Sequence, residues 1–202
     1  MFILSNKIDM STKVDNILKW MLGILISWRK MIHLFAGGRS VLDTDFASLE
    51  GLKVFINFAW KKVPNEFIDI LIWGDYFVGD FLKEDFNEKP SFKLVCLRGA
   101  NGKARGWIDA AYEYPQYNFT LPWAILWLRE QYSEEKILIH GLDGDGYDYY
   151  DGWNKTNVLF PDKPFDQVLS AIQRCYLQLD KLDKTNLYVQ PGSAYKGFPE
   201  WQ

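Results

Sequence analysis

Aromatic side chains are the feature that most constrains how this chain can fold. The 202 residues include 14 Phe, 11 Tyr and 9 Trp, which together make up 17% of the sequence. Some of these rings must fill a core, and Tyr and Trp also provide large contact areas at binding surfaces. Hydrophobic residues account for 48% of the chain, which is enough apolar surface to offset the entropy lost on folding. We therefore expect a folded globular protein with an aromatic binding surface.

The chain is expected to form one domain. It contains no internal repeat, low-complexity tract or flexible linker, and its length allows one domain with a substantial core. We predict a single α+β domain over residues 1–202, with residues 1–11 as a loose N-terminal segment. The expected architecture is a set of long N-terminal helices, a small and mainly antiparallel sheet, and further helices.

The first part of the sequence favours helices. Between residues 12 and 36, polar residues recur every three or four positions and trace one narrow stripe, which predicts a helix that ends at Gly37-Gly38. Apolar residues at helical spacing predict a second helix over residues 43–62, before Pro64. Residues 65–84 match both helix and strand patterns, and we favour a helix.

The second part favours strands with two further helices. The segments FKLVCLRG (92–99) and KARGWIDAAYEY (103–114) flank Asn101-Gly102, a pair that supplies the positive φ angles of a tight hairpin turn. We therefore expect these two strands to be antiparallel. The remaining expected elements are a helix over 120–132, a buried strand KILIH over 136–140, a helix over 164–184 and an edge strand NLYVQ over 186–190.

Charge limits the classes of partner. The net charge is −3 and the pI about 5.4, whereas a general nucleic-acid binder usually carries a basic excess. Residues 1–40 carry a balance of +4 and the remainder −7. A basic N-terminal helix could dock on its own domain, form a homodimer through residues 12–36, or bind a membrane surface. We favour docking, because apolar residues outweigh basic ones in that helix. The apolar stretch from Trp20 to Trp28 is also short of the ~20 residues that span a bilayer, and we expect no secretory signal.

Cysteine and histidine give little support for catalysis. Two cysteines cannot form a disulfide framework, so a reduced, cytoplasmic protein is the simplest interpretation. Cys96 and Cys175 are expected to be buried packing residues, and His33 to be solvated or to cap a helix. No phosphate loop, dinucleotide fingerprint or G-x-S-x-G nucleophile elbow is present. We expect no cofactor and favour a function other than catalysis.

The segment GLDGDGYDYYDGWN, residues 141–154, is the strongest functional signal in the sequence. It interleaves carboxylates with aromatic rings and contains no Lys or Arg. Such a segment gives a negative field that speeds association with a basic partner, and apolar contacts that slow dissociation. A solvated turn with its tyrosines packed on the domain is the alternative. The candidate partner-binding residues are Asp143, Asp145, Tyr147, Asp148, Tyr149, Tyr150, Asp151 and Trp153.

A metal site is a second interpretation of the same segment. Oxygen ligands two residues apart suit a hard cation such as Ca²⁺. The helix-loop-helix calcium pattern fails, however, because either alignment leaves ligand positions without a carboxylate. A looser site would use His140, Asp143 and Asp145, and would make the protein a small metal-dependent enzyme.

These observations lead to one favoured functional hypothesis. The small acidic immunity proteins of bacterial toxin systems share this size, acidity and aromatic content, which is a likeness of composition and not of motif. The sequence thus favours a protein that neutralises a basic toxin, such as a nuclease, by covering its active site. A metal-dependent enzyme and a membrane-surface protein remain as alternatives.

Overall fold

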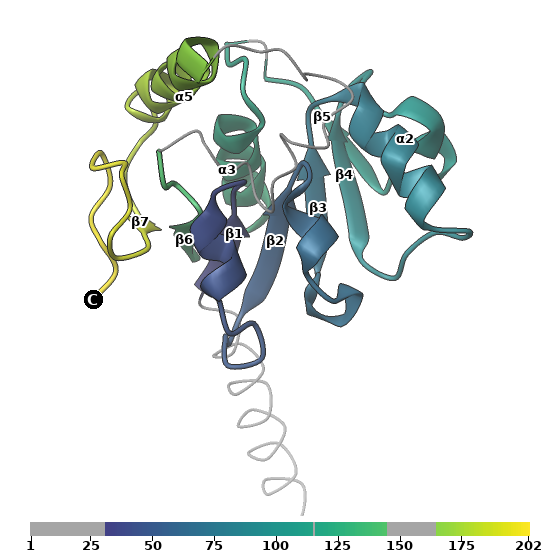
Figure 1. The fold of residues 1–202 in the computed structure, drawn as a ribbon, viewed down its shortest axis with the longest axis horizontal. Helices are drawn as coiled ribbons and strands as arrows, with labels where there is room; N and C mark the ends of the chain where they lie inside the picture. Colours follow the sequence, from purple (N-terminus) through teal and green to yellow (C-terminus); the bar gives the residue numbers. More distant parts are fainter. Residues whose placement is uncertain (1–30, 115, 145–164) are drawn as a thin grey trace, which may run out of the picture.

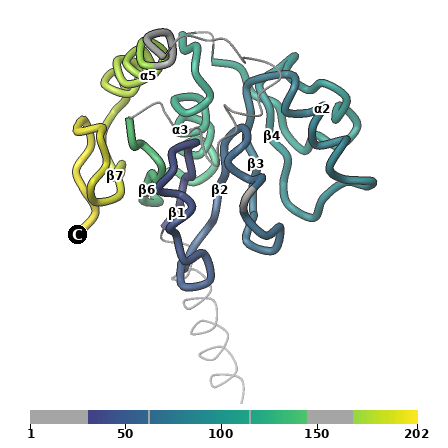
Figure 2. Tube along the Cα trace, in the orientation of Figure 1, coloured from purple at the N-terminus to yellow at the C-terminus, as the bar shows by residue number. Residues whose placement is uncertain are grey.

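The structure is a computed structural model that describes residues 31–114, 116–144 and 165–202. Its centre is one seven-stranded sheet in which every strand pairing is parallel, in the order β5-β4-β3-β2-β1-β6-β7 (Figures 1 and 2). The strands are β1 (Met31–Phe35), β2 (Leu52–Ile56), β3 (Ile70–Trp73), β4 (Lys93–Leu97), β5 (Ala110–Tyr112), β6 (Lys136–His140) and β7 (Leu187–Val189).

In the described part of the chain, three α-helices and four short 3-10 helices connect these strands. The α-helices are α2 (Tyr76–Asp85), α3 (Thr120–Gln131) and α5 (Phe165–Leu179). The 3-10 helices are η1 (Arg39–Asp43), η2 (Ala59–Lys62), η3 (Asn65–Phe67) and η4 (Gly102–Trp107). Parallel strands need such crossover connections, because a tight turn can only join antiparallel neighbours.

The two faces of the sheet are covered by different parts of the chain. From β1 the chain moves outward strand by strand to β5, and side chains from η1, η2, α2 and η4 pack with Phe55 and Trp73 on one face. It then returns through α3 to β6 and β7, and α3 packs with Ile32 and Ile137 on the opposite face, where Leu179 of α5 is also buried. The sheet is therefore an open, doubly wound α/β sheet whose strand order reverses between β1 and β6.

The predicted fold class is wrong. The sheet is large and entirely parallel, where a small and mainly antiparallel one was expected. The predicted hairpin over residues 92–114 is wrong as well, because β4 and β5 pair in parallel. Gly102 does have a positive φ of 50°, but the turn at Asn101-Gly102 begins η4, which carries the chain back before β5 starts.

The predicted N-terminal helices are also corrected. Residues 31–35 of the helix expected over 12–36 form β1, which pairs with β2 and β6 inside the sheet. The helix expected over 43–62 contains the end of η1, strand β2 and the 3-10 helix η2. Residues 65–84 divide into η3, β3 and most of α2. Strands buried on both faces of a parallel sheet are continuous apolar runs, which at five residues are easily mistaken for helix.

Several elements of the second half are confirmed. Helix α3 and strand β6 lie where the sequence predicts them, and so do α5 and β7 within a few residues. The single domain over residues 1–202, the loose segment 1–11 and a homodimer through 12–36 stay predictions, because residues 1–30 lie outside the described part of the chain.

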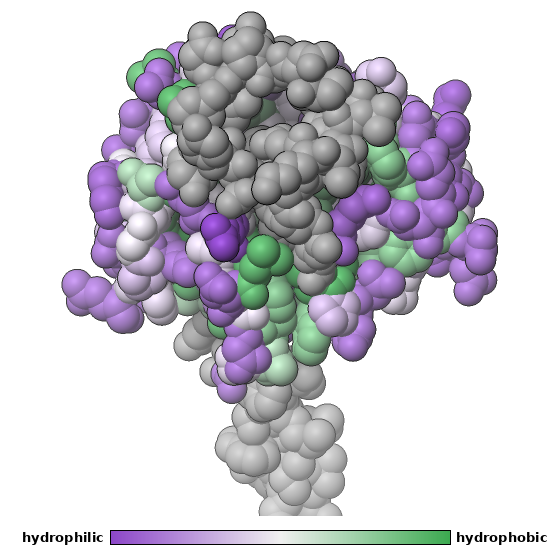
Figure 3. All heavy atoms as spheres, viewed as in Figure 1, coloured by the Kyte–Doolittle hydropathy of each residue, from purple (hydrophilic) through white to green (hydrophobic). Residues whose placement is uncertain are grey.

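The outer surface is mixed in character. In the view of Figure 3, hydrophilic side chains cover both flanks of the described surface, and hydrophobic ones gather near its middle. Among the described residues, the large hydrophobic side chains that are exposed are Leu42, Tyr76 and Leu177. The same residues include no helix with the length and apolar character that crossing a membrane requires.

Candidate functional site

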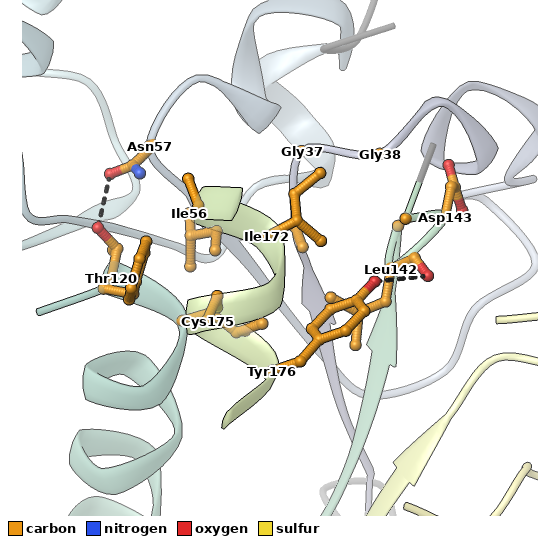
Figure 4. A pocket seen from close by; sticks show the side chains of 16 residues that line it. Gly37, Gly38, Ile56, Asn57, Thr120, Leu142, Asp143, Ile172, Cys175 and Tyr176 are labelled. Atoms are coloured by element: carbon orange, nitrogen blue, oxygen red, sulfur yellow. Dashed lines mark hydrogen bonds between the residues drawn. The ribbon is translucent and has the colours of Figure 1, made fainter. Parts of the chain in front are cut away.

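A cavity lies at the point where the strand order reverses. It is lined by residues that follow the carboxyl ends of β1, β2 and β6, by the N-terminus of α3 and by one side of α5 (Figure 4). Open α/β sheets bind their ligands in the crevice outside the carboxyl ends of the strands at this switch point. The topology alone therefore marks this cavity as the candidate site.

The cavity has a volume of about 170 Å³. This is close to the ~150 Å³ of an apolar cavity known to accept benzene, so it has room for a group about the size of one ring. Its walls are largely apolar, with polar groups from Asn57, Thr120, Asp143 and Tyr176 among them. The apolar side chains in its lining are Ala36, Ile56, Phe119, Leu121, Leu142, Ala171, Ile172 and Cys175.

Two backbone hydrogen bonds join the segments that follow β1 and β6. The Ala36 N–H donates to the His140 carbonyl (2.9 Å), and the Gly38 N–H donates to the Gly141 carbonyl (3.0 Å). A Cβ atom on Gly38 would overlap the Gly141 carbonyl oxygen, and Gly141 has a positive φ of 76°. Both positions therefore require glycine if the two segments are to approach this closely.

Asp143 ties the same two segments together through its side chain. One carboxylate oxygen accepts a hydrogen bond from the Ser40 backbone N–H (2.7 Å) and the other accepts one from the Ser40 hydroxyl (2.6 Å). Both oxygens are thus engaged at the first turn of η1. Asp143 shapes the rim of the cavity while its charge is partly compensated by these two donors.

Asn57 follows β2 directly and has an uncommon backbone conformation, with φ of 47°. Its side-chain oxygen accepts hydrogen bonds from the Gly74 N–H (3.3 Å) and the Thr120 hydroxyl (3.2 Å). No described residue accepts a hydrogen bond from its amide nitrogen. These contacts fix the amide so that the side chain offers a donor, and non-glycine residues with positive φ are often found at binding sites.

Other donors meet the same space. Among the described residues, none accepts a hydrogen bond from the Gly37 backbone N–H. The residue before α3 is Phe119, whose side chain cannot cap the helix, so the Thr120 and Leu121 backbone N–H groups lack a side-chain acceptor there, and Pro122 has no N–H. The residues that line the cavity thus include several with an N–H group that has no acceptor among the described residues.

Helix α5 forms the outer wall. Ile172, Cys175 and Tyr176 line the cavity and are only half-buried, and the Tyr176 hydroxyl donates to the Leu142 carbonyl (3.4 Å). Burial raises the pKa of the Cys175 thiol to about 12, so the thiol stays protonated near neutral pH. Cys175 thus contributes apolar surface to the cavity, and the other cysteine, Cys96, is buried in the opposite face.

The structure places one of the eight predicted partner-binding residues. Asp143 lies at the rim of the cavity, bonded to Ser40 as described above. The other seven, which are Asp145, Tyr147, Asp148, Tyr149, Tyr150, Asp151 and Trp153, lie outside the described residues. The acidic and aromatic surface therefore stays a prediction.

The predicted metal ligands His140 and Asp143 have other partners. His140 is buried and contacts His33 and Gln190, while Asp143 contacts Ser40. Within the described ranges, no group of three His, Cys, Asp or Glu residues could hold a metal ion. Asp145 lies outside those ranges, so the complete trio is not tested.

Sequence reasoning missed Gly37, Asn57 and Thr120 as site residues. The glycine pair was interpreted as a helix stop, whereas it forms the turn that follows a buried strand. An apolar strand followed at once by two glycines is a signal that could have identified this turn. Asn57 gave no local signal, because its role depends on the position of Gly74 and Thr120 in the fold.

Comparison with known proteins gives little further information. No protein-family model matches the chain, and no curated protein matches it either. One similar solved structure is a protein from Lactobacillus plantarum, determined as a structural-genomics target, with 12% sequence identity and a TM-score of 0.41. The alignment covers 80% of this chain and 60% of that one. A likeness at this level carries no argument about function.

Proposed function

We propose that the protein binds a nucleotide, or a related phosphorylated small metabolite, in the cavity at the switch point. The observation that carries this proposal is the position of the cavity at the carboxyl ends of β1 and β6, with Gly37 and Asn57 in its lining. Open parallel sheets bind nucleotides at this place, so the step from cavity to ligand class rests on the general behaviour of such sheets.

The chemistry of the lining supports a ligand with two unlike parts. Ile56, Leu142 and Ile172 supply apolar walls in a space about the size of one ring. The Gly37 N–H, the Asn57 amide and the N-terminus of α3 supply donors and a partial positive charge. A nucleotide combines a flat ring with oxygen acceptors, and therefore matches both requirements.

The turn after β1 departs from the dinucleotide-binding pattern. The sequence continues Gly37-Gly38-Arg39-Ser40 without the G-x-G-x-x-G spacing, and it enters the five-residue η1 and not a long helix. A cavity of about 170 Å³ is also small for a dinucleotide. The proposal is accordingly for a mononucleotide or a ligand of similar size.

The immunity-protein hypothesis depends on a different part of the chain. The residues on which the acidic surface depends lie almost entirely outside the described part of the chain. That hypothesis therefore stays a separate prediction, which a binding assay with a basic protein partner would test.

Thermal unfolding with a panel of ligands tests the proposal. The panel contains the mono- and diphosphates of the four ribonucleosides, the free nucleosides and inorganic phosphate. A ligand at a hundred times its dissociation constant adds ~2.7 kcal/mol to the native state. At ~2–4 °C per kcal/mol this gives a rise in the unfolding temperature of about 5–10 °C. No shift with any phosphorylated member at millimolar concentration would contradict the proposal.

A matched pair of variants locates the binding. Ile172→Trp places a larger side chain in the cavity wall and should abolish the ligand-induced shift. Gln173→Trp makes the same addition at the neighbouring exposed position of α5 and should leave the shift unchanged. A shift that survives in Ile172→Trp would place the ligand elsewhere.

A further inference from the structure

The two histidines of the chain meet in the interior, between β1 and β6. His33 Nδ1 lies 3.0 Å from His140 Nε2, although the residues are 107 positions apart in the sequence. His33 Nε2 lies 3.0 Å from the Glu50 carbonyl oxygen, and His140 Nδ1 lies 3.3 Å from the side-chain oxygen of Gln190. The four groups form one chain of hydrogen bonds that crosses the sheet from the loop before β2 to the end of β7.

The protons on the two imidazole rings decide which of these hydrogen bonds can form. The Glu50 carbonyl can only accept, so His33 Nε2 carries a proton, and a neutral His33 then accepts at Nδ1 from the His140 Nε2–H. A neutral His140 has a bare Nδ1, which needs a donor. In the structure the Gln190 side-chain oxygen faces the ring, and a half-turn of the amide places its NH₂ group there as the donor.

With the Gln190 oxygen facing His140, all three bonds require three N–H protons on two rings, which is one imidazolium. A second added proton would have to go on His33 Nδ1, where it would face the His140 N–H directly. The hydrogen bond between the rings cannot survive that step. The hydrogen bond between the two rings therefore forms when both are neutral. It also forms after one proton is added, but then the pair carries a buried charge. A second added proton breaks it.

The surroundings oppose the charged states. His33 and His140 are 6% and 5% exposed, and Phe35 stacks on His140 with ring centroids 4.5 Å apart. Lys53 on β2 is the register partner of His33 and its positive charge repels an imidazolium there. The groups that contact the pair from the loop and from β7 are the neutral Glu50 carbonyl and the neutral Gln190 amide. In the described part of the chain, no carboxylate bonds to either ring.

We propose that His33, His140 and Gln190 form a proton-sensitive joint between β1, β6 and the end of β7, which holds the strands together while the imidazoles are neutral and weakens as they take up protons. The joint adjoins the candidate site, because the His140 carbonyl also accepts the Ala36 N–H. The proposal concerns the fold itself and does not depend on the ligand of the cavity.

The direction of the pH effect follows from the histidine pKa values. Burial lowers the pKa of both rings, that of His140 to about 4 with a further contribution from His33, whereas both are near ~6.5 in the unfolded chain. The contribution to stability is complete above pH ~6.5 and is lost as the pH falls toward 4. As the pH is lowered between these values, the equilibrium constant for folding should fall about tenfold per pH unit for each proton that binds to the unfolded chain but not to the folded one.

Nuclear magnetic resonance and pH-dependent urea unfolding test the joint together. Because the chain has two histidines, all imidazole signals of a protein purified without a histidine tag belong to this pair. Ring ¹⁵N spectra should show both histidines neutral at pH 6, with His33 protonated on Nε2 and His140 on Nε2. The equilibrium constant for unfolding should rise tenfold or more as the pH falls from 6 to 5, a range above the titration of ordinary carboxyl groups.

Two variants make the test specific. His140→Gln retains an amide donor toward His33 but does not titrate. Its loss of stability between pH 6 and pH 5 should therefore be smaller than that of the natural protein, and the difference should equal the contribution of one histidine. Gln190→Glu supplies a carboxylate that favours the imidazolium, so it should raise the pKa of His140 and reduce the acid-induced loss. Folded-state titration of both histidines near pH 6.5 in the natural protein, or an unchanged pH dependence in Gln190→Glu, would overturn the proposal.

Discussion

The two faces of the sheet differ at the carboxyl ends of the strands. On the face covered by α2 and the 3-10 helices, Phe35, Phe55 and Trp73 fill the interior, and Phe35 stacks on Phe55 with centroids 4.6 Å apart. On the face covered by α3 and α5, small or short residues such as Ala36 and Gly37 leave the cavity. The same strands thus place large rings on one side and a binding space on the other. Packing that stabilises the fold and space that can hold a ligand are separated by the thickness of one sheet.

Trp73→Ala should have the largest effect on stability. Trp73 is fully buried, and its indole N–H donates to the Ala100 carbonyl (2.7 Å). Replacing a buried Trp by Ala typically costs ~3–5 kcal/mol. Ile172→Ala, in the half-buried wall of the cavity, should cost less than ~1 kcal/mol because little packing is lost. Urea unfolding of both variants measures this difference, and equal losses would remove the contrast between the faces.

Gly38→Ala should have an intermediate effect. The added Cβ would overlap the Gly141 carbonyl oxygen and lie 2.6 Å from an Asp143 carboxylate oxygen. Overpacking of this kind typically costs ~1–3 kcal/mol, and it should also abolish the ligand-induced rise in unfolding temperature. Gly106→Ala is the control, because its Cβ meets no atom within 4 Å. We expect Gly106→Ala to change stability by less than ~0.5 kcal/mol; similar losses in the two variants would contradict the close approach of the segments after β1 and β6.

Asn57→Asp should have the smallest effect on stability and a large effect on binding. Aspartate tolerates positive φ and can accept the same hydrogen bonds from Gly74 and Thr120. It replaces the amide donor at the cavity by an acceptor, which repels the oxygen atoms of a phosphorylated ligand. We expect a change in unfolding free energy below ~1 kcal/mol and at least tenfold weaker binding by isothermal titration calorimetry. Unchanged affinity would exclude Asn57 from the ligand site.

The elements that the sequence predicted correctly are those with strong local signals. Helix α3 begins at Thr120 with Pro122 in its first turn, a position where proline is favoured. Strand β6 is a short apolar run between charged and glycine residues. Both signals lie within a few residues of the element itself, so no knowledge of the remaining fold is needed.

The elements that the sequence missed depend on distant partners. Strand β1 follows the apolar stretch Trp20 to Trp28 after only Arg29-Lys30, and its pairing with β2 and β6 makes it extended. The sequence around strand β5 predicts half of a hairpin, because it does not show that η4 returns the chain so that β5 pairs in parallel with β4. The candidate site was missed for the same reason, because Gly37, Asn57 and Thr120 are far apart in sequence. Among the predicted site residues that the structure describes, Asp143 lies at the cavity.

The position of β1 between β2 and β6 has a consequence for how the protein acquires its structure. During synthesis, strands β1 to β5 leave the ribosome before β6 exists, so β1 is an apolar edge until residues 136–140 arrive. Unpaired strand edges promote aggregation, and pairings between distant segments slow folding. Closing the β1–β6 seam is therefore expected to be the late, slow step of folding, and the nascent chain should be most dependent on chaperones just before it.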